Sequence, residues 1–546
     1  MRLPFFFGFG VFPFYNRGCS SIFLGLEFDA MLSIFPFEND IPPDMVKGIP
    51  VSRKDYLREG RVDNWRGPFR EVTSPLLIRT VAGLCQKTIG SVPSMDEEAS
   101  MGLLHEARKA FNNGRGEWPS LPAGERAGRF AEFLKRMESA REDIVRLLQW
   151  EIGKTAQESL NEFDRAISYA RSCIARVTEY SRTKRDVIQL SGISGKLERT
   201  PRGIVLIMGP FNYPLFETMT ALVPAMLSGN TLIIKPPRLG CLFFQHFLKH
   251  VEAIFPGGAV NFVYGDGRRV IPPLIASGGV DVFYFIGTSS VASYLRGLHP
   301  KPHRLECILG LEAKNPAIIL PDADIDAAAA ECAKGSLTFN GQRCAALKVL
   351  FVHRSIADQF NDRLKHEIAG FKSGLPWEND VIITPLAEAH RTGYLSGLVD
   401  DALGLGAHVI NDGGGDVTGT FFYPALLYPA SAAMRVCREE QFGPVVPVVP
   451  YDSFDEPLRY ITESNYGQQA SIFGRDRGRL KELINYLVHH VSRVNINCQC
   501  QRSPDLVPFT GRKDSAEGSL SISEAIEAFT VPTFIATKTG NVDLIF

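Results

Sequence analysis

Short apolar runs alternate with amphipathic stretches through residues 203–298, and this alternation constrains the fold more than any other feature of the sequence. GIVLIMGP (203–210), TLIIK (231–235), AVNFVY (259–264) and DVFYFIG (281–287) have the continuous apolar character of strands that are buried on both faces. Helical patterns at 215–230, 243–255 and 268–277 separate these runs. Strands and helices that alternate at this pace form parallel βαβ units, so we predict a doubly wound, Rossmann-type sheet.

The C-terminal half of the chain predicts a second α/β unit. Strand-like runs occur at 316–320, 349–353, 445–451, 469–474 and 493–497, with helical stretches at 325–337 and 356–371. Residues 122–180 are helical in pattern, and residues 186–202 predict a hairpin. Residues 525–538 end in a strand-like piece with no obvious partner nearby in sequence. A chain of 546 residues is long enough for two or three domains.

The charge balance gives no indication of a strongly basic surface that would bind nucleic acid or a membrane. Lys and Arg number 59 against 60 for Asp and Glu, which leaves a formal net charge of −1. The ten cysteines show no zinc spacing, so we predict no metal site and reduced thiols in a cytoplasmic type of compartment. The Phe-rich residues 1–30 lack an apolar run long enough to span a bilayer. They are either a targeting peptide or sequence upstream of a start at Met31.

Four local motifs carry side chains that could do chemistry. PFNYP (210–214) follows the first buried strand, where Asn212 could donate to an oxyanion or simply cap a helix. IIKPPR (233–238) ends the next strand in Lys235, which could hold ribose hydroxyls or be a solvated charge. NGQRC places Cys344 beside a cation, and a neighbouring cation favours a nucleophilic thiolate. REEQFGP (438–444) offers paired acids, which are usually solvent-facing. Singly, each motif is better explained without a functional role.

Taken in order, these motifs resemble those of the aldehyde dehydrogenase superfamily from about residue 35 to residue 538. The matching motifs are PFNYP, IIKPP, FIGTSS, AKNPAIIL, NGQRC and EEQFGP. NGQRC followed by QRSPDLVPFTGRKDSAEG resembles the branch of NADP-dependent, non-phosphorylating glyceraldehyde-3-phosphate dehydrogenases. The resemblance implies a Rossmann-type cofactor domain, an α/β catalytic domain and a small β oligomerisation element.

The resemblance also implies roles for individual residues. Cys344 would attack the aldehyde, and the amide of Asn212 would stabilise the oxyanion of the thiohemiacetal, which hydride transfer converts into a thioester. The positions that match cofactor contacts are Lys235 and Glu440 at the two riboses, Gly287 and Thr288 beside the pyrophosphate and nicotinamide, and Phe442 and Pro210.

Three positions with arginine indicate which cofactor and which substrate the protein binds, and a fourth is open to two interpretations. Arg238 stands where NAD-preferring relatives often carry a glutamate, and it would attract a 2′-phosphate, so we predict NADP over NAD, with NAD still possible. Arg343 and Arg502 are expected to bind the phosphate of a small phosphorylated aldehyde. Arg165 is either a third phosphate contact or a surface helix partner.

One departure from the family pattern concerns the general base that hydrolyses the thioester. Gly310 occupies the position of that glutamate, and Glu312 follows two residues later. Residues two apart on an extended segment share a face, about 6–7 Å apart, so Glu312 is a candidate replacement or a substitution with no catalytic role. The departure keeps three alternatives open: another aldehyde as substrate, acyl transfer to coenzyme A or another thiol, and a cofactor-binding protein without turnover.

The resemblance divides the chain into four segments. We predict an N-terminal extension (1–45), a cofactor-binding domain (46–312) that carries the 186–202 hairpin, a catalytic domain (313–505) and a C-terminal oligomerisation segment (506–546). The hairpin and the tail match segments that build subunit contacts in relatives, so we expect a homodimer or homotetramer.

Overall fold

A six-stranded sheet forms in the region where the apolar runs alternate. In the computed structural model, which describes residues 34–51, 54–183, 187–519 and 521–538, its strands are ordered β11-β10-β9-β12-β13-β27. Their bounds are β9 Ile204–Met208, β10 Thr231–Lys235, β11 Val260–Phe262, β12 Val282–Ile286, β13 Glu306–Gly310 and β27 Ala516–Glu517. β9 to β13 are parallel, and only β27 runs antiparallel. The predicted doubly wound sheet is confirmed.

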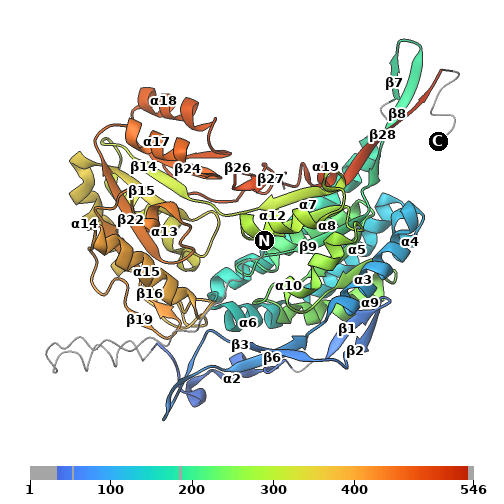
Figure 1. The fold of residues 1–546 in the computed structure, drawn as a ribbon, viewed down its shortest axis with the longest axis horizontal. Coiled ribbons are helices and arrows are strands. Elements are labelled where there is room, and N and C mark those ends of the chain that lie inside the picture. The colour runs from blue at the N-terminus through green and yellow to red at the C-terminus, as the bar shows by residue number, and fades with distance from the viewer. Residues whose placement is uncertain (1–33, 52–53, 184–186, 520, 539–546) are drawn as a thin grey trace, which may run out of the picture.

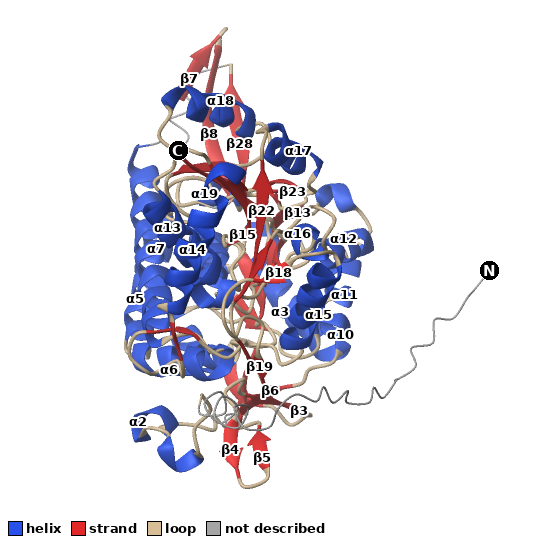
Figure 2. Ribbon diagram, turned by 90° about the vertical axis from the view of Figure 1, so that its left-hand side faces the viewer, coloured by secondary structure: helices blue, strands red, loops and turns tan. Residues whose placement is uncertain are grey.

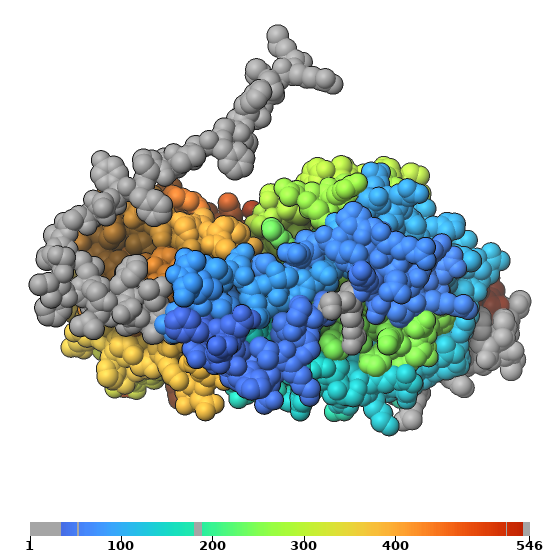
Figure 3. Space-filling model, turned by 90° about the horizontal axis from the view of Figure 1, so that it is seen from below, coloured from blue at the N-terminus to red at the C-terminus, as the bar shows by residue number. Residues whose placement is uncertain are grey.

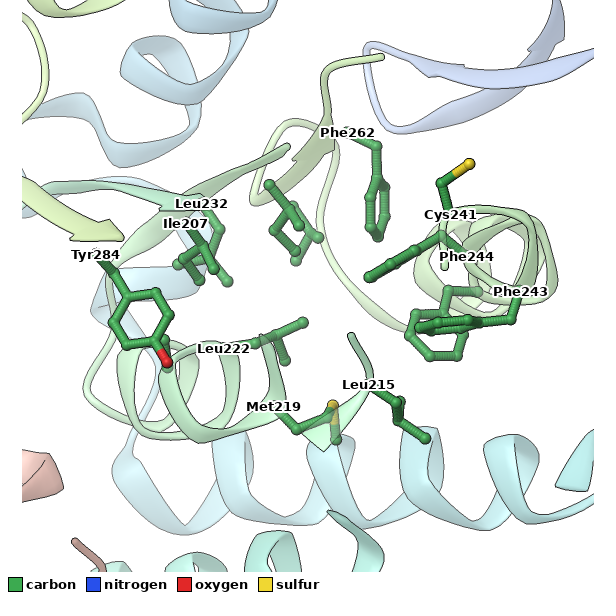
Figure 4. Close-up of a cluster of buried hydrophobic side chains, with 14 of the residues drawn as sticks. Ile207, Leu215, Met219, Leu222, Leu232, Cys241, Phe243, Phe244, Phe262 and Tyr284 are labelled. Atoms are coloured by element: carbon green, nitrogen blue, oxygen red, sulfur yellow. The ribbon is translucent and has the colours of Figure 1, made fainter. Parts of the chain in front are cut away.

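Helix α8 (Phe216–Leu227) is the innermost helix of this unit, and every one of its residues is buried. It packs on β9 and β10 with one face and on α7 (Ala156–Thr183) and α5 (Ala123–Glu138) with the other. Figure 4 shows Leu222 of this helix on the side of Ile207 and Leu232 of the sheet, and Leu215 and Met219 belong to the same buried cluster. Because the helix is buried along its whole length, most of its residues are apolar and it has no broad polar face.

The second α/β unit contains a seven-stranded sheet in the order β18-β21-β22-β15-β14-β24-β25. The bounds are β14 Asn315–Ile319, β15 Leu347–His353, β18 His408–Val409, β21 Ala425–Tyr428, β22 Val445–Tyr451, β24 Gln469–Phe473 and β25 Arg493–Ile496. All neighbours are parallel except the short β18. Helices α13 (Ile325–Leu337), α14 (Ala357–Ala369), α15 (Arg391–Gly404), α17 (Asp455–Glu463) and α18 (Arg477–Leu487) belong to this unit. Figure 2 shows strands running through the middle of the molecule with helices on both sides.

A third, antiparallel sheet projects from the body of the molecule. It consists of the hairpin β7 (Val187–Leu190) and β8 (Ile193–Pro201) and the tail strand β28 (Thr530–Thr537), as the upper right of Figure 1 shows. β28 pairs with β8 along its whole length, from Thr530 opposite Pro201 to Thr537 opposite Ser194. The tail strand therefore finds its partner more than 300 residues away in sequence.

The segment before α5 lies across the lower face of the molecule, in blue in Figure 3. It contains β3 (Phe69–Thr73), β6 (Thr88–Pro93) and α3 (Glu97–Phe111), which packs on β10. Phe35 is fully buried in the core of the second unit, and Ile41 and Met45 are buried in that of the first. The end of the expected extension thus packs into the body, whereas its first 33 residues, including Met31, lie outside the described residues.

Within the described ranges, the helices are all too short or too polar to span a bilayer. No group of three or more His, Cys, Asp or Glu side chains in the same ranges is arranged to hold a metal ion.

Candidate active site

A cavity of about 570 Å³ opens between the carboxyl ends of β9, β10, β12 and β13 in the six-stranded sheet and the segments that precede β15, β22 and β24 in the seven-stranded sheet. Most of the residues predicted from the motifs line it: Pro210, Asn212, Arg238, Gly287, Thr288, Glu312, Cys344, Glu440 and Phe442. Lys235, Arg165, Arg343 and Arg502 are not part of this lining. The motifs, which lie up to 232 residues apart in sequence, are thus brought to one site where the two α/β units meet.

Cys344 follows a tight segment in which Phe339, Asn340 and Gly341 all have positive φ, at 49°, 54° and 69°. Non-glycine residues rarely adopt this conformation, so other contacts must hold it. Asn340 does so by exchanging hydrogen bonds with Thr384: its Nδ2 donates to Oγ1 and to the carbonyl, both at 3.0 Å, and its Oδ1 accepts from the backbone N–H at 3.0 Å. The strain is consistent with a segment that is shaped to present Cys344.

The thiol of Cys344 is partly exposed toward the cavity. Burial raises the pKa of this thiol above its usual range; the Glu217 and Glu440 carboxylates raise it further, while Lys348 and Arg502 lower it. Arg343 does not provide the cation that the sequence led us to expect. Its guanidinium donates to the carbonyl of Gly335 at 3.0 Å and to Gln499 at 3.4 Å, away from the cavity lining. The expected contact of Arg343 with a substrate phosphate therefore has no support in the geometry.

Asn212 is buried, and its position is fixed from both sides. Its Nδ2 donates to the carbonyl of Gln342, two residues before Cys344, at 2.8 Å. The backbone carbonyl of Asn212 accepts from Lys154 Nζ at 2.8 Å. Lys154 is fully buried, forms an ion pair with Glu162 and lies 3.4 Å from the ring centroid of Tyr213. The amide is thus anchored to the backbone that carries the nucleophile.

Glu162 holds the C-terminal end of the segment that runs from Asn212 to the start of α8. Its Oε1 accepts the backbone N–H groups of Leu215 at 3.0 Å and Phe216 at 3.1 Å, where α8 begins. Backbone N–H groups in the first turn of a helix have no partner within the helix, so a carboxylate there satisfies them. Lys154 and Glu162 are positioning residues that the motifs did not reveal, because neither differs in type from an ordinary surface helix residue.

The acid of the EEQFGP motif is also held in place. Glu440 Oε1 accepts from Lys348 Nζ at 2.5 Å and from the Ala313 backbone at 3.2 Å. Lys348 is almost fully buried and lies 4.9 Å from the ring centroid of Phe442, whose φ is 43°. The second oxygen of Glu440 therefore remains available to a ligand in the cavity.

Lys314 also holds the EEQFGP motif in place through buried hydrogen bonds. Its Nζ donates to the carbonyls of Val436 and Glu439 and to Gln441 Oε1, at 2.5 to 2.6 Å. Burial lowers its pKa to about 7. The lysine of the AKNP motif thus shapes the loop that carries Glu440.

Basic side chains surround the end of β10. Lys235 is buried, and Nζ makes one hydrogen bond, to the carbonyl of Pro236 at 2.9 Å; burial lowers its pKa to about 8. Arg238 is exposed at the cavity, and its carbonyl accepts from Arg70 Nη2 at 3.0 Å. A buried ammonium with unused donors, next to two guanidinium groups, fits the ribose and 2′-phosphate of an adenine dinucleotide.

Glu312 lies at the N-terminus of α12 (Ser289–Leu298). Its carboxylate accepts the backbone N–H of Ser289 at 2.8 Å and lies 3.5 Å from the hydroxyl. This contact satisfies a first-turn N–H and holds the carboxylate at the turn after β12. Gly310 lines the cavity at the end of β13, and a Cβ there would lie 3.2 Å from Ile286 Cγ1. The structure thus gives Glu312 a capping contact.

The two remaining arginines are paired with acids. Arg502 Nη1 donates to Glu217 Oε2 at 2.5 Å, and both side chains are buried. Arg165, on α7, donates to both oxygens of Asp505, at 2.6 and 3.0 Å. Arg165 is therefore not a helix-surface partner of a neighbour on α7. The acids Glu217 and Asp505 offset the charge of these arginines, and Glu217 also lines the cavity.

The family follows from this geometry and from comparison with known proteins. Residues 72–535 match the model of the aldehyde dehydrogenase family, and the protein belongs to this family. It is 29% identical over 476 residues to an NADP-dependent glyceraldehyde-3-phosphate dehydrogenase of Pisum sativum, covering 85% of this chain and 92% of that protein. It is 31% identical over 470 residues to one of Streptococcus equinus, covering 83% of this chain and 94% of that protein.

A solved structure gives the same result. The NADP-dependent glyceraldehyde-3-phosphate dehydrogenase from Bacillus halodurans, in complex with NADP, superimposes with a TM-score of 0.81 at 28% identity. The match covers 89% of this chain and 99% of that chain. The expected fold class and family are therefore confirmed.

Proposed function

We propose that the protein oxidises an aldehyde to a carboxylic acid, with NADP as hydride acceptor and Cys344 as the nucleophile. The observation that carries this proposal is the arrangement of Cys344, Asn212 and Glu440 around one cavity in a member of the aldehyde dehydrogenase family. Names of relatives that include NADP dependence support the choice of cofactor.

Cys344 loses its proton, and its sulfur bonds to the carbonyl carbon of the aldehyde. The negative charge that develops on the carbonyl oxygen is stabilised by the Asn212 amide, and such a donor contributes about 10²–10³ in rate. Asn212 suits this role because Gln342 and Lys154 fix it on both sides, so little reorganisation is required. NADP, when bound, accepts the hydride of the resulting thiohemiacetal. The thioester left on Cys344 is then hydrolysed.

The protein groups that would hold NADP lie at the carboxyl ends of β10 and β12. Lys235 would donate to the adenosine ribose, and Arg238 would bind the 2′-phosphate. Gly287 and Thr288, with Pro210, would border the pyrophosphate and nicotinamide. On the other side of the cavity, the free oxygen of Glu440 would accept from the nicotinamide ribose, with Phe442 beside the ring.

The proposed substrate is glyceraldehyde 3-phosphate, which would yield 3-phosphoglycerate. Two relatives and a solved structure that carry this substrate in their names support it, as does Arg502, whose charge acts on the Cys344 thiol. A direct test compares kcat/KM for glyceraldehyde 3-phosphate and for glyceraldehyde, with NADP saturating. We expect a preference of at least about 100-fold for the phosphorylated aldehyde, the value of two charge-assisted hydrogen bonds. Equal values would reject the assignment.

A second candidate is an unphosphorylated aldehyde, and one observation favours it. Glu217 and Asp505 neutralise both arginines, so a phosphate would have to displace or share these partners. The same substrate comparison distinguishes the candidates, because a neutral site would show no gain from the phosphate. Adding coenzyme A to the assay tests transfer of the acyl group to another thiol.

We further propose that the projecting sheet joins subunits into a dimer or tetramer. Ile188, Ile193 and Leu197 of the hairpin and Val531 and Phe534 of β28 are exposed apolar side chains on this sheet. The nine described cysteines are free thiols, which supports the proposed reducing, cytoplasmic location. The proposed role in glycolysis rests on the proposed substrate alone. Analytical ultracentrifugation of the purified protein would test the assembly, and a monomer would contradict it.

A further inference from the structure

Hydrolysis of a thioester on Cys344 requires a group that removes a proton from the attacking water. The position at which relatives carry a glutamate for this step is Gly310, which has no side chain. Glu312, the nearest substitute in sequence, is held at the N-terminus of α12 by Ser289. The other carboxylates of the cavity are therefore further candidates for the catalytic base on which the proposed hydrolysis depends.

Five carboxylates line the cavity, namely Glu217, Glu312, Glu388, Glu439 and Glu440. Glu388 is paired with Arg391 at 2.8 Å, and Glu439 with Arg435 at 2.7 Å. Their side chains are 26% and 41% exposed, which places both toward the mouth of the cavity.

Among these carboxylates, Glu217 and Glu440 contribute most to raising the pKa of the Cys344 thiol. Glu440 is tied to the buried Lys348 and the Ala313 backbone through one oxygen, and its other oxygen is assigned to the cofactor. Glu217 is the remaining carboxylate near the sulfur.

Glu217 is positioned to act on a water beside Cys344. It lies in the first turn of α8, five residues after Asn212, and its side chain is 9% exposed. Arg502 binds Oε2, whereas Oε1 has no hydrogen-bond partner among the described residues. Because Oε1 lacks a partner but is not fully buried, and Glu217 lines the cavity, Oε1 faces the cavity. Burial raises the pKa of this carboxyl, and Arg502 and Arg165 oppose the shift.

We infer that Glu217 is the general base for hydrolysis of the Cys344 thioester. Its Oε1 accepts a proton from a water molecule while the water oxygen bonds to the thioester carbon. The C–S bond then breaks, its electron pair stays on the Cys344 sulfur, and the carboxylic acid leaves. Glu217 passes the proton to that thiolate, so that thioester and water give acid and thiol with no oxidant consumed. Arg502 orients the carboxylate through Oε2.

Rapid mixing of Glu217→Gln with NADP and glyceraldehyde 3-phosphate tests this role. Glutamine keeps the size of the side chain and can still accept from Arg502 through its carbonyl oxygen. We expect an NADPH burst close to one per subunit, followed by turnover reduced by about 100-fold or more, since general-base help contributes about 10²–10⁴ in rate. Mass spectrometry of the quenched reaction should show the acyl group on Cys344. The burst itself shows that the variant is folded and binds both ligands.

Two further variants complete the experiment. Glu388→Gln removes a carboxylate from the same cavity, and we expect wild-type turnover. Gly310→Glu, combined with Glu217→Gln, supplies a carboxylate at the position of the family's base. Its Cβ would require Ile286 to move by only a few tenths of an ångström, and we expect at least tenfold recovery of turnover.

The outcomes separate this inference from the proposed function. Turnover of Glu217→Gln within threefold of the wild type overturns the role of Glu217 but leaves the proposed oxidation intact. Loss of both burst and turnover in Glu217→Gln also overturns it, because the defect would then precede hydrolysis. No NADPH from the wild-type protein with any aldehyde would overturn the proposed function and this inference together.

Discussion

The preference for NADP can be tested by changing the charge at Arg238. This side chain is exposed at the end of β10, and its carbonyl accepts from Arg70. A charge-assisted hydrogen bond to a phosphate contributes about 1.5–3 kcal/mol, and each 1.36 kcal/mol is tenfold in rate. Because solvent screens an exposed guanidinium, we expect the lower end of this range. Arg238→Ala should lower kcat/KM for NADP by about tenfold and leave that for NAD nearly unchanged.

Arg238→Glu goes further, because it places a negative charge beside the 2′-phosphate. We expect the ratio of kcat/KM for NADP to that for NAD to fall by about 100-fold, measured from the absorbance of the reduced cofactor. Arg268→Glu is the matched control: Arg268 is also basic and exposed, but its guanidinium is paired with Asp266. An unchanged ratio in Arg238→Glu, or an equal fall in the control, would refute the reasoning.

Three further predictions concern the nucleophile and its support. Because burial raises the pKa of Cys344, its alkylation by iodoacetamide in the absence of cofactor should accelerate with rising pH, with a midpoint above the usual value of about 8.5; a lower midpoint would contradict this. Gly341→Ala should abolish activity and lower the thermal midpoint, because φ is 69° and the Cβ would lie 2.7 Å from the Gly443 carbonyl, whereas Gly393→Ala, with open space, should not. Lys154→Met should cost about 3–5 kcal/mol by leaving Glu162 buried without its cation, and adding Glu162→Gln should recover part of this loss in thermal unfolding.

The sequence predicted the two parallel sheets because their strands are buried on both faces and read as continuous apolar runs. The resemblance to the aldehyde dehydrogenase superfamily also predicted that Cys344, Asn212 and Glu440 share one site, and all three line the same cavity. The pairing of β28 with β8 was not predictable, because no local pattern identifies a partner 300 residues away.

Side-chain direction was the main limit at the site. Adjacency in sequence placed Arg343 beside Cys344, but the backbone turns its guanidinium toward Gly335. Glu217 was not predicted as a site residue, because a single acid within an apolar helix does not indicate a cavity. Its partner Arg502 lies 285 residues away, so only the fold brings the pair together.

The account as a whole depends on a covalent bond between Cys344 and the carbon of the aldehyde. The most direct measurement is mass spectrometry of the protein quenched during the first turnover with NADP and glyceraldehyde 3-phosphate, alongside NADPH absorbance. We predict an acyl adduct on the peptide that contains Cys344, and neither adduct nor NADPH from Cys344→Ala. NADPH formation at the wild-type rate by Cys344→Ala would contradict the account.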